Sequence, residues 1–249
     1  MPGRTADRPL VSCVMVTGGR RMFVGQSLRY FERQDYLARE LVIIDDGDQG
    51  LSEDVRGMAN VQYKRVLAGL TIGTKRNLGC ELAKGQIIAQ WDDDDWYAPD
   101  RLSRQVLPLL AGEADVCGLR MGVVFDLDRW RFWRCTPRVH RCMFVGDVHG
   151  GTLVFSKRLF EQGLRYRDLS LAEDAYFIFD AKRRNARLGI LSNDDLFVYV
   201  RHGTNAWQFT CGQHIDPAGW SQVTVPASFK ADLDFYEKRA ERQLLATGT

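Results

Sequence analysis

The chain has 249 residues, enough to bury a sizeable core in a single α/β domain. Its hydrophobic fraction of 45% and charged fraction of 27% exclude a disordered chain, and its net charge of +2 excludes a general attraction to nucleic acid. The longest apolar runs are far below the ~20 residues of a transmembrane helix, so no transmembrane segment is expected.

The N-terminus and the cysteines indicate a cytoplasmic protein. Residues 1–9 contain two arginines and one aspartate, and they lack the apolar region of a signal peptide. The six cysteines include no Cys-x-x-Cys pair, as expected for buried, reduced thiols. We therefore expect a cytoplasmic location, with peripheral contact at the inner face of the membrane left open.

Three apolar runs in the first hundred residues predict buried strands. They are Leu10 to Val16, Leu41 to Ile44 and Ile87 to Trp91, and their continuous apolar character is typical of a parallel sheet covered on both faces. Apolar residues at helical spacing predict a helix from Met22 to Arg33 between the first two strands. These elements form a βαβ unit.

Two more helices are predicted on either side of the third strand. The first runs from Thr74 to Lys84, with Thr74 as its N-cap and Gly85 positioned to end it. Pro99 suits the first turn of the next helix, whose apolar stripe reaches Leu109.

The second half of the chain predicts a mixed arrangement of strands and helices. The expected strands are Asp115 to Phe125, Thr152 to Phe155, Leu188 to Leu191 and Leu196 to Val200, and the expected helices are Glu173 to Arg183 and Phe229 to Leu244. The whole chain therefore reads as one α/β domain, mostly parallel at first and mixed towards the C-terminus.

Four consecutive carboxylates, Asp92 to Asp95, follow the third predicted strand. They repel one another unless a cation neutralises them, and oxygen ligands suit Mg²⁺ or Mn²⁺. If the run continues the strand, Asp92 and Asp94 share one face, with Asp93 and Asp95 on the other. The alternative is an exposed acidic turn, which the preceding apolar strand makes less favourable because ligands bind at the carboxyl ends of such strands.

Two further motifs place charged residues at the end of a predicted strand and at the start of a predicted helix. Leu41-Val-Ile-Ile-Asp45-Asp46-Gly47 ends a buried strand with acids that can accept hydrogen bonds from a base or ribose, unless it is a plain Asp-Gly turn. Lys75 and Arg76 stand at the start of a helix, where they oppose its dipole and require a phosphate or a nearby carboxylate as partner. A solvated helix start is the alternative there.

These three motifs, in this order, resemble the family 2 glycosyltransferases of the GT-A fold. The matching segments are Val11-Ser-Cys-Val-Met-Val-Thr17, Val42-Ile-Ile-Asp45-Asp46-Gly47, Lys75-Arg76-Asn77 to Ala83-Lys-Gly85, and Trp91 to Asp95 followed by Pro99-Asp-Arg. The last segment is similar to the Asp-x-Asp motif of that family.

The resemblance implies a GT-A fold, a Rossmann-like α/β structure whose mostly parallel central sheet is flanked by helices and whose C-terminal part is mixed. It implies a single domain over residues 1–249, with about 10–110 binding a nucleotide sugar and about 111–249 binding the acceptor. The implied reaction transfers a sugar from a UDP-, GDP- or dTDP-linked donor to an acceptor hydroxyl with inversion, and it depends on a divalent cation, Mn²⁺ or Mg²⁺.

The resemblance also assigns roles to individual residues. Asp94 is the principal metal ligand, and the residues that contact the nucleotide sugar are Thr17, Asp46, Arg76, Asp92 and Asp93.

Two later residues extend the implied site. Ala172-Glu173-Asp174 is similar to the Glu-Asp pair that opens a helix in the family, which makes Asp174 the candidate catalytic base; an acidic first helical turn is the alternative. His202 follows an apolar strand and resembles the late histidine that completes the metal site in some members, although a structural histidine is the alternative.

One departure from the family pattern leaves base recognition open. Gly18 and Gly19 stand where the family often has an aromatic residue and an asparagine. The segment Gly18-Gly19-Arg20-Arg21 resembles, faintly, the phosphate loop of a sugar-nucleotide nucleotidyltransferase, which is an alternative function. A non-catalytic carbohydrate-binding homologue is another, and the presence of Asp94 and Asp174 argues against it.

Five arginines from Arg129 to Arg141 are interleaved with aromatic residues, a composition able to hold a phosphorylated, lipid-linked or sugar acceptor, or to contact a membrane surface. A solvated edge strand is the alternative. The nearby metal-ligand types, Cys135, His140, Cys142 and His149, match no common zinc module in their spacing.

Overall fold

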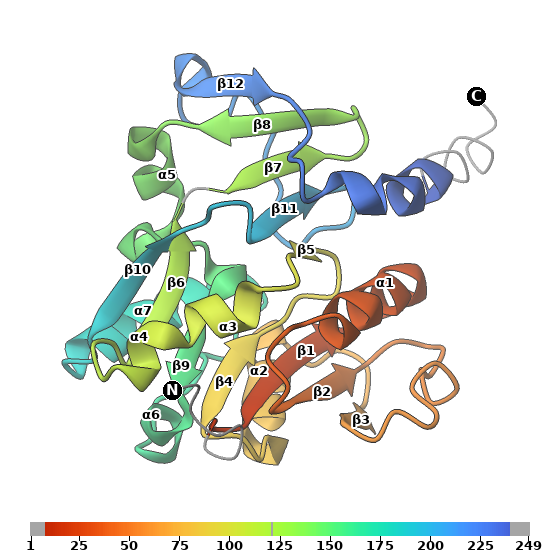
Figure 1. Ribbon diagram of the computed structural model, residues 1–249, viewed down its shortest axis with the longest axis vertical. Helices are drawn as coiled ribbons and strands as arrows, with labels where there is room; N and C mark the ends of the chain where they lie inside the picture. Colours follow the sequence, from red (N-terminus) through yellow and green to blue (C-terminus); the bar gives the residue numbers. More distant parts are fainter. Residues whose placement is uncertain (1–7, 121, 240–249) are drawn as a thin grey trace, which may run out of the picture.

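The computed structural model describes residues 8–120 and 122–239, and within them the strands form two sheets (Figure 1). The larger sheet has the order β10 (Leu188–Ser192), β6 (Val116–Arg120), β9 (Val154–Ser156), β4 (Ile87–Gln90), β1 (Val11–Thr17), β2 (Arg39–Asp45) and β3 (Val61–Arg65). The smaller sheet has the order β12 (Trp220–Val223), β8 (Arg131–Cys135), β7 (Val123–Asp126), β11 (Phe197–Arg201) and β5 (Trp96–Tyr97).

Helices connect and cover these strands. The α-helices are α1 (Arg21–Glu32), α2 (Ile72–Leu82), α3 (Arg101–Gln105), α4 (Leu107–Leu110), α5 (Pro137–Met143), α6 (Lys157–Glu161) and α7 (Glu173–Arg183). Short 3₁₀ helices are η1 (Val145–Asp147), η2 (Gly150–Thr152), η3 (Pro217–Gly219) and η4 (Lys230–Asp232), and residues 233–239 are helical.

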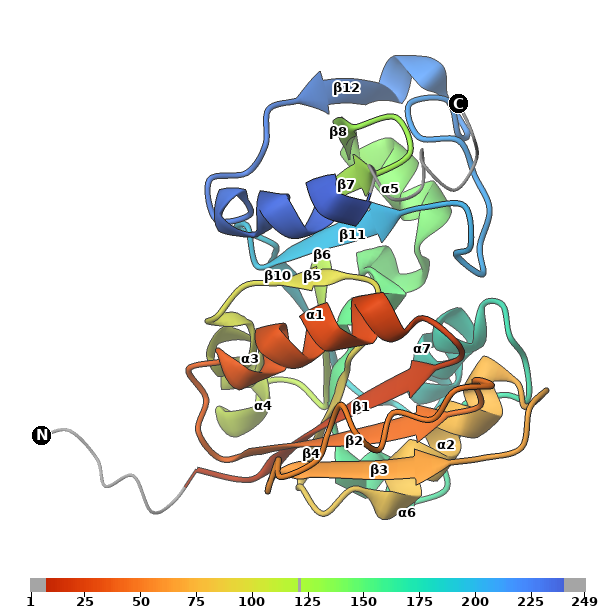
Figure 2. The same cartoon turned by 90° about the vertical axis from the view of Figure 1, so that its right-hand side faces the viewer.

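The first half of the chain forms the parallel sheet that its apolar runs predict. Strand β1 pairs in parallel with both β2 and β4, with Thr17 opposite Asp45 and Val14 opposite Gln90. Because parallel strands end at the same edge, the acidic segments after β2 and β4 meet beside the end of β1. In Figure 2 this edge is on the right, towards which β1, β2 and β3 point, and α5 and α7 lie on the same side.

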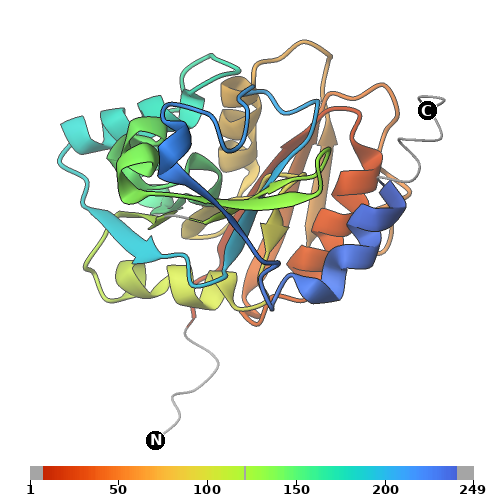
Figure 3. The same cartoon turned by 90° about the horizontal axis from the view of Figure 1, so that it is seen from above.

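Alternate residues of β1 serve two different cores. Val11, Cys13 and Met15 pack with α1 and with the inner face of the smaller sheet, whereas Val14 and Val16 pack with α2, α6 and α7. The view from above shows α1 on one side of the molecule and α7 on the other (Figure 3). The larger sheet is therefore buried on both faces, which explains its continuous apolar strands.

The C-terminal segment packs back on α1, as its apolar stripe predicts. The Tyr236 hydroxyl lies 3.1 Å from that of Tyr30, and Asp232 accepts hydrogen bonds from Arg33 (2.8 Å) and from the Trp96 indole (2.7 Å). The rest of the helix predicted to reach Leu244 lies outside the described residues.

The predicted strand from Asp115 to Phe125 is wrong, because it is two strands in different sheets. Strand β6 pairs with β9 and β10, whereas β7 pairs with β8 and β11. Gly122 lies between them, and a Cβ there would come within 2.3 Å of the Asn193 side chain. A continuous apolar pattern does not reveal this change of sheet, since both strands are buried.

Three helix and strand boundaries also differ from the prediction. Helix α2 has Thr71 as its N-cap, with the Thr71 side chain accepting the N–H of Thr74 at 3.1 Å. The helix predicted from Pro99 begins at Arg101 and divides after Gln105, because Pro108 has no N–H with which to continue it. Strand β9 begins at Val154, after the 3₁₀ turn of η2.

Candidate active site

A cavity of about 330 Å³ lies at the carboxyl edge of β1 and β4, and it is lined by a group of acidic residues and a group of apolar residues. We call Asp92, Asp94, Asp95, Glu173 and Asp174 the acidic lining; they come from the segment after β4 and from the first turn of α7. We call Met143, Phe144, Val145 and Trp207 the apolar lining; they come from α5, from η1 and from the segment after β11. Arg20 and Arg76 also line the cavity.

The four aspartates do not continue strand β4. The strand ends at Gln90, the Asp92 N–H donates to the Tyr97 hydroxyl at 2.7 Å, and residues 93–95 form a bend. The alternation of faces is expected only if the run continues the strand, and that condition is not met, because strand pairing stops before the run begins. Asp95, which also lines the cavity, accepts the N–H of Val200 at 2.9 Å, and this hydrogen bond connects the bend to the smaller sheet.

One oxygen of Asp94 faces three different side chains. This atom, Oδ2, lies 2.5 Å from Arg20 Nη1, 3.1 Å from His202 Nε2 and 3.4 Å from Asn205 Nδ2. Burial by itself would raise the pKa of Asp94, but Arg20 and His202 outweigh it and lower the pKa to about 2. Asp94 is thus held as an anion.

Asp93 is positioned by the strand register. Since Val14 pairs with Gln90, Asp93 falls beside Thr17, whose hydroxyl donates to Asp93 Oδ2 at 2.5 Å. Arg20 Nε donates to the same oxygen at 3.1 Å. Burial raises the pKa of Asp93 despite this arginine. Asp93 and Thr17 therefore lie behind the residues that line the cavity and do not line it themselves.

The two cations at the start of α2 find carboxylates, one of the two kinds of partner that the sequence predicts. Lys75 Nζ lies 2.7 Å from Asp46 Oδ1, outside the cavity lining. Arg76 is buried and pairs with Asp92 at 2.9 Å and with Glu173 at 3.1 Å. Arg76 thus joins the segment after β4 to the start of α7.

Asp174 and Asp92 occupy space that two adjacent glycines leave open. A Cβ on Gly150 would lie 1.5 Å from Asp174 Oδ2, and a Cβ on Gly151 would lie 2.6 Å from Asp92 Oδ2. Burial, and then the neighbouring Glu173 carboxylate, raise the pKa of Asp174 to about 6. Asp174 thereby acquires the basicity that a proton acceptor near neutral pH requires.

Four residues of the site were missed as site residues by sequence reasoning. Arg20 was noticed only within a faint phosphate-loop pattern, His149 only as a metal-ligand type, and Asn205 and Trp207 carried no motif of their own. The one local signal is that Asn205 follows His202 closely and accepts its N–H at 2.6 Å.

His149 supplies a neutral hydrogen-bond donor at this site. Its Nδ1 accepts the N–H of Gly151 at 3.2 Å, so the ring proton is on Nε2. Nε2 is buried and has no hydrogen-bond partner among the described residues. Burial lowers the His149 pKa to about 3, which keeps the ring uncharged.

The two other sequence hypotheses concern the arginine-rich segment and the residues of metal-ligand type, and of these residues only His149 lines the cavity. The five arginines from Arg129 to Arg141 lie in the described part of the chain, and none of them lines the cavity. Strand β8, in the middle of that segment, is not an edge strand, because β12 and β7 pair on its two sides. Among the described residues, no three His, Cys, Asp or Glu side chains gather as a metal-binding group.

The sequence matches the model of "Glycosyl transferase family 2" over residues 12–167, more than half of the chain. The chain belongs to this family. Similar proteins are a putative glycosyltransferase, EpsH, of Bacillus subtilis (26% identity over 157 residues; 58% of this chain, 45% of that one) and a putative colanic acid biosynthesis glycosyl transferase, WcaA, of Escherichia coli (30% over 102 residues; 39% and 37%). This family 2 chain thus matches less than half of the length of each relative.

Solved structures show that the family 2 chain has the GT-A glycosyltransferase fold predicted from its sequence. S. aureus TarS 1–349 in complex with UDP-GlcNAc superposes with a TM-score of 0.62 at 19% identity, covering 79% of this chain and 60% of TarS. The mannosyltransferase PcManGT of Pyrobaculum calidifontis, in complex with GDP-Man and Mn²⁺, gives 0.63 at 18% identity, covering 79% and 57%.

Proposed function

We propose that this protein transfers a sugar from a nucleotide-sugar donor to an acceptor hydroxyl, with inversion, in the cavity described above. The observation that carries the proposal is that Asp94 and Asp174 line one cavity at the carboxyl edge of the sheet, with His202 Nε2 3.1 Å from Asp94 Oδ2. Membership of glycosyl transferase family 2 supports the same reaction class.

The donor is proposed to be a UDP-, GDP- or dTDP-sugar. TarS has been seen with UDP-GlcNAc and PcManGT with GDP-Man, and both share the fold of this chain. The edge beyond β2 offers Asp46, paired with Lys75, for the nucleobase, and the cavity offers Arg76 and Asp92 for the rest of the donor. Thr17 and Asp93 hold this edge together.

A divalent cation, Mn²⁺ or Mg²⁺, fits the donor atoms that Asp94 and His202 present. Asp94 Oδ2 and His202 Nε2 face each other at 3.1 Å, and Asn205 holds both residues in place. Two protein ligands are enough when the diphosphate and water complete the coordination, as is usual for Mg²⁺ beside phosphates. When bound, the cation would stabilise the negative charge that develops on the departing diphosphate.

Asp174 is proposed to act as the base. Its Oδ2, in the space left by Gly150, would take the proton of the acceptor hydroxyl as that oxygen bonds to the anomeric carbon. The bond from the anomeric carbon to the diphosphate oxygen breaks at the opposite face, and the nucleoside diphosphate leaves with that electron pair. One such displacement inverts the anomeric configuration.

The acceptor is proposed to lie against the apolar lining, as a saccharide or a lipid-linked or small molecule. The rings of Trp207 and Phe144 form a T-shaped contact, and Trp207 presents an aromatic surface to the cavity. In residues 8–120 and 122–239 no helix has both the length and the apolar character to cross a bilayer. We propose that residues 1–249 act as a single domain in the cytoplasm, with any membrane contact being peripheral.

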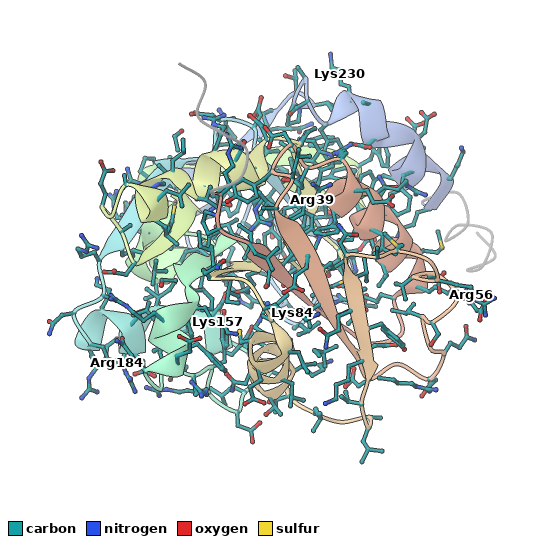
Figure 4. The ribbon with its side chains drawn as sticks, turned by 60° about the horizontal axis from the view of Figure 1, so that its bottom comes forward. Arg39, Arg56, Lys84, Lys157, Arg184 and Lys230 are labelled. Carbon is teal, nitrogen blue, oxygen red and sulfur yellow. The ribbon has the colours of Figure 1, made fainter. Side chains whose placement is uncertain are left out.

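Nucleic acid is not proposed as a partner. The six basic side chains labelled in Figure 4 are spread across the molecule, from Arg56 at one side to Arg184 at the other, instead of forming one stripe. The net charge of +2 agrees with this distribution.

The proposal is tested by thermal unfolding of the wild type and Asp94→Ala with UDP-, GDP- and dTDP-sugars, with and without Mn²⁺. One donor class should raise the melting temperature of the wild type only with Mn²⁺, corresponding to about 2.7 kcal/mol at a hundredfold excess over Kd. Asp94→Ala should lose this shift. Asp100→Ala, which alters a half-exposed carboxylate outside the cavity, should keep it. No shift with any donor would contradict the proposal.

A further inference from the structure

The side chain of Arg20 spans two of the four consecutive carboxylates. Its Nη1 lies 2.5 Å from Asp94 Oδ2, and its Nη2 lies 2.6 Å from Asp93 Oδ1. Its Nε donates to Asp93 Oδ2 at 3.1 Å, so every nitrogen of the guanidinium faces a carboxylate. One arginine therefore supplies the positive charge that this part of the run requires.

Arg20 uses the same oxygen that a divalent cation would use. Asp94 Oδ2 also faces His202 Nε2 at 3.1 Å, and these two atoms are the pair that fits Mn²⁺ or Mg²⁺. A cation on this pair would lie beside a guanidinium of the same sign in a buried setting, where like charges repel strongly. The cation and Arg20 in its present position therefore exclude each other.

The second arginine of the cavity is bound in a different way. Arg76 has a side chain only 6% exposed and is held by Asp92 and Glu173, which come from separate elements. Arg20 follows Gly18-Gly19 in the loop before α1. Its side chain is 27% exposed and lines the cavity. Arg76 is thus fixed, whereas Arg20 has open space into which its side chain can rotate.

We propose that Arg20 is an exchangeable counter-ion: it neutralises Asp93 and Asp94 before the donor binds, and it moves onto the donor diphosphate when a divalent cation takes its place. This inference rests on the proposed function, because it requires a donor with a diphosphate. A guanidinium released from two carboxylates matches phosphate oxygens well, since its planar N–H groups bind both kinds of anion in pairs.

The exchange makes cation binding and nucleotide binding cooperative. Without nucleotide, a cation must displace Arg20 from two carboxylates and leave it without an equivalent partner. With a nucleoside diphosphate present, the displaced guanidinium gains a new anion. The nucleotide therefore raises the affinity for the cation, and by linkage the cation raises the affinity for the nucleotide by the same factor.

The test is Mn²⁺ binding, measured from the spectrum of free Mn²⁺ in electron paramagnetic resonance, with no nucleotide and with UDP or GDP. Arg20→Ala should bind Mn²⁺ alone about tenfold more tightly than the wild type, and the nucleotide should increase its Mn²⁺ affinity less than in the wild type. Arg21→Ala is the matched control, because Arg21 pairs with Asp54 and does not line the cavity. It should bind like the wild type.

Thermal unfolding gives a second measurement and covers the case in which Arg20→Ala folds poorly. Arg20→Gln keeps the length of much of the side chain without its charge, and both variants should melt at lower temperature in EDTA and regain stability with Mn²⁺. If these variants bind Mn²⁺ no more tightly than the wild type does, the proposed exchange is wrong. This holds even if the wild type binds nucleotide in a metal-dependent way. If the wild type binds no nucleoside diphosphate with Mn²⁺, the proposed function fails as well.

Discussion

The two linings of the cavity are held in opposite ways. Ion pairs hold the acidic lining in place. Arg76 pairs with Asp92 and Glu173, and Arg20 pairs with Asp94 and Asp93. The apolar lining is held by ring contacts, such as Trp207 against Phe144 at 5.8 Å, and Trp207 is half-buried. Charged groups fixed by several partners suit a reaction centre, whereas a surface of aromatic rings adapts to the shape of what binds there.

The largest effect is expected when the acidic lining loses its base. Asp174→Asn should lower kcat by about 10² to 10⁴, because the amide cannot accept the proton of the acceptor hydroxyl. Donor affinity, measured by isothermal titration calorimetry, should change little. Asp180→Asn is the matched control on the same helix, since Asp180 forms an exposed ion pair with Arg167 and does not line the cavity. Equal losses in the two variants would contradict the role of Asp174.

The same base should set the acid limb of the pH profile. Burial and Glu173 raise the pKa of Asp174 to about 6, and only the deprotonated carboxylate acts as a base. Hence kcat should fall about tenfold per pH unit below this pKa and level off above it. The inflection should be absent in Asp174→Asn; if that variant keeps it, another group is the base.

A smaller effect is expected from displacing the base without removing it. Gly150→Ala places a methyl group where Asp174 Oδ2 now lies, so the carboxylate must shift and kcat should fall about 10²-fold. Gly25→Ala is the control, because its Cβ meets nothing within 4 Å on helix α1. That variant should keep full activity and gain about 0.5–1 kcal/mol in unfolding free energy. Full activity in Gly150→Ala would show that the position of Asp174 is unimportant.

The smallest effect should come from the apolar lining. Trp207→Ala removes an aromatic surface worth about 0.5–1.5 kcal/mol, so KM for the acceptor should rise about two- to tenfold. Among residues 8–120 and 122–239, no hydrogen bond or ion pair joins Trp207 to the acidic lining, so Mn²⁺-dependent donor binding should remain. Loss of donor binding in Trp207→Ala would remove the distinction between the two linings.

Several features of the fold follow from local sequence signals. The continuous apolar runs predicted β1, β2 and β4 correctly, because strands covered on both faces carry apolar residues at every position. The motif of four aspartates follows β4, and three of its members line the cavity there. The same apolar signal failed at Gly122, where the chain passes from one buried strand to another in a different sheet.

The sequence by itself determined the family, the parallel half of the sheet and the acids at its carboxyl edge, because periodicity and short motifs act over a few residues. Only the tertiary structure decided which charges meet. Arg20 and Asp94 are 74 positions apart, and His202 and Asp94 are 108 apart. Such pairs form when separate elements converge on one edge of the sheet, and no local pattern records which side chain will face which.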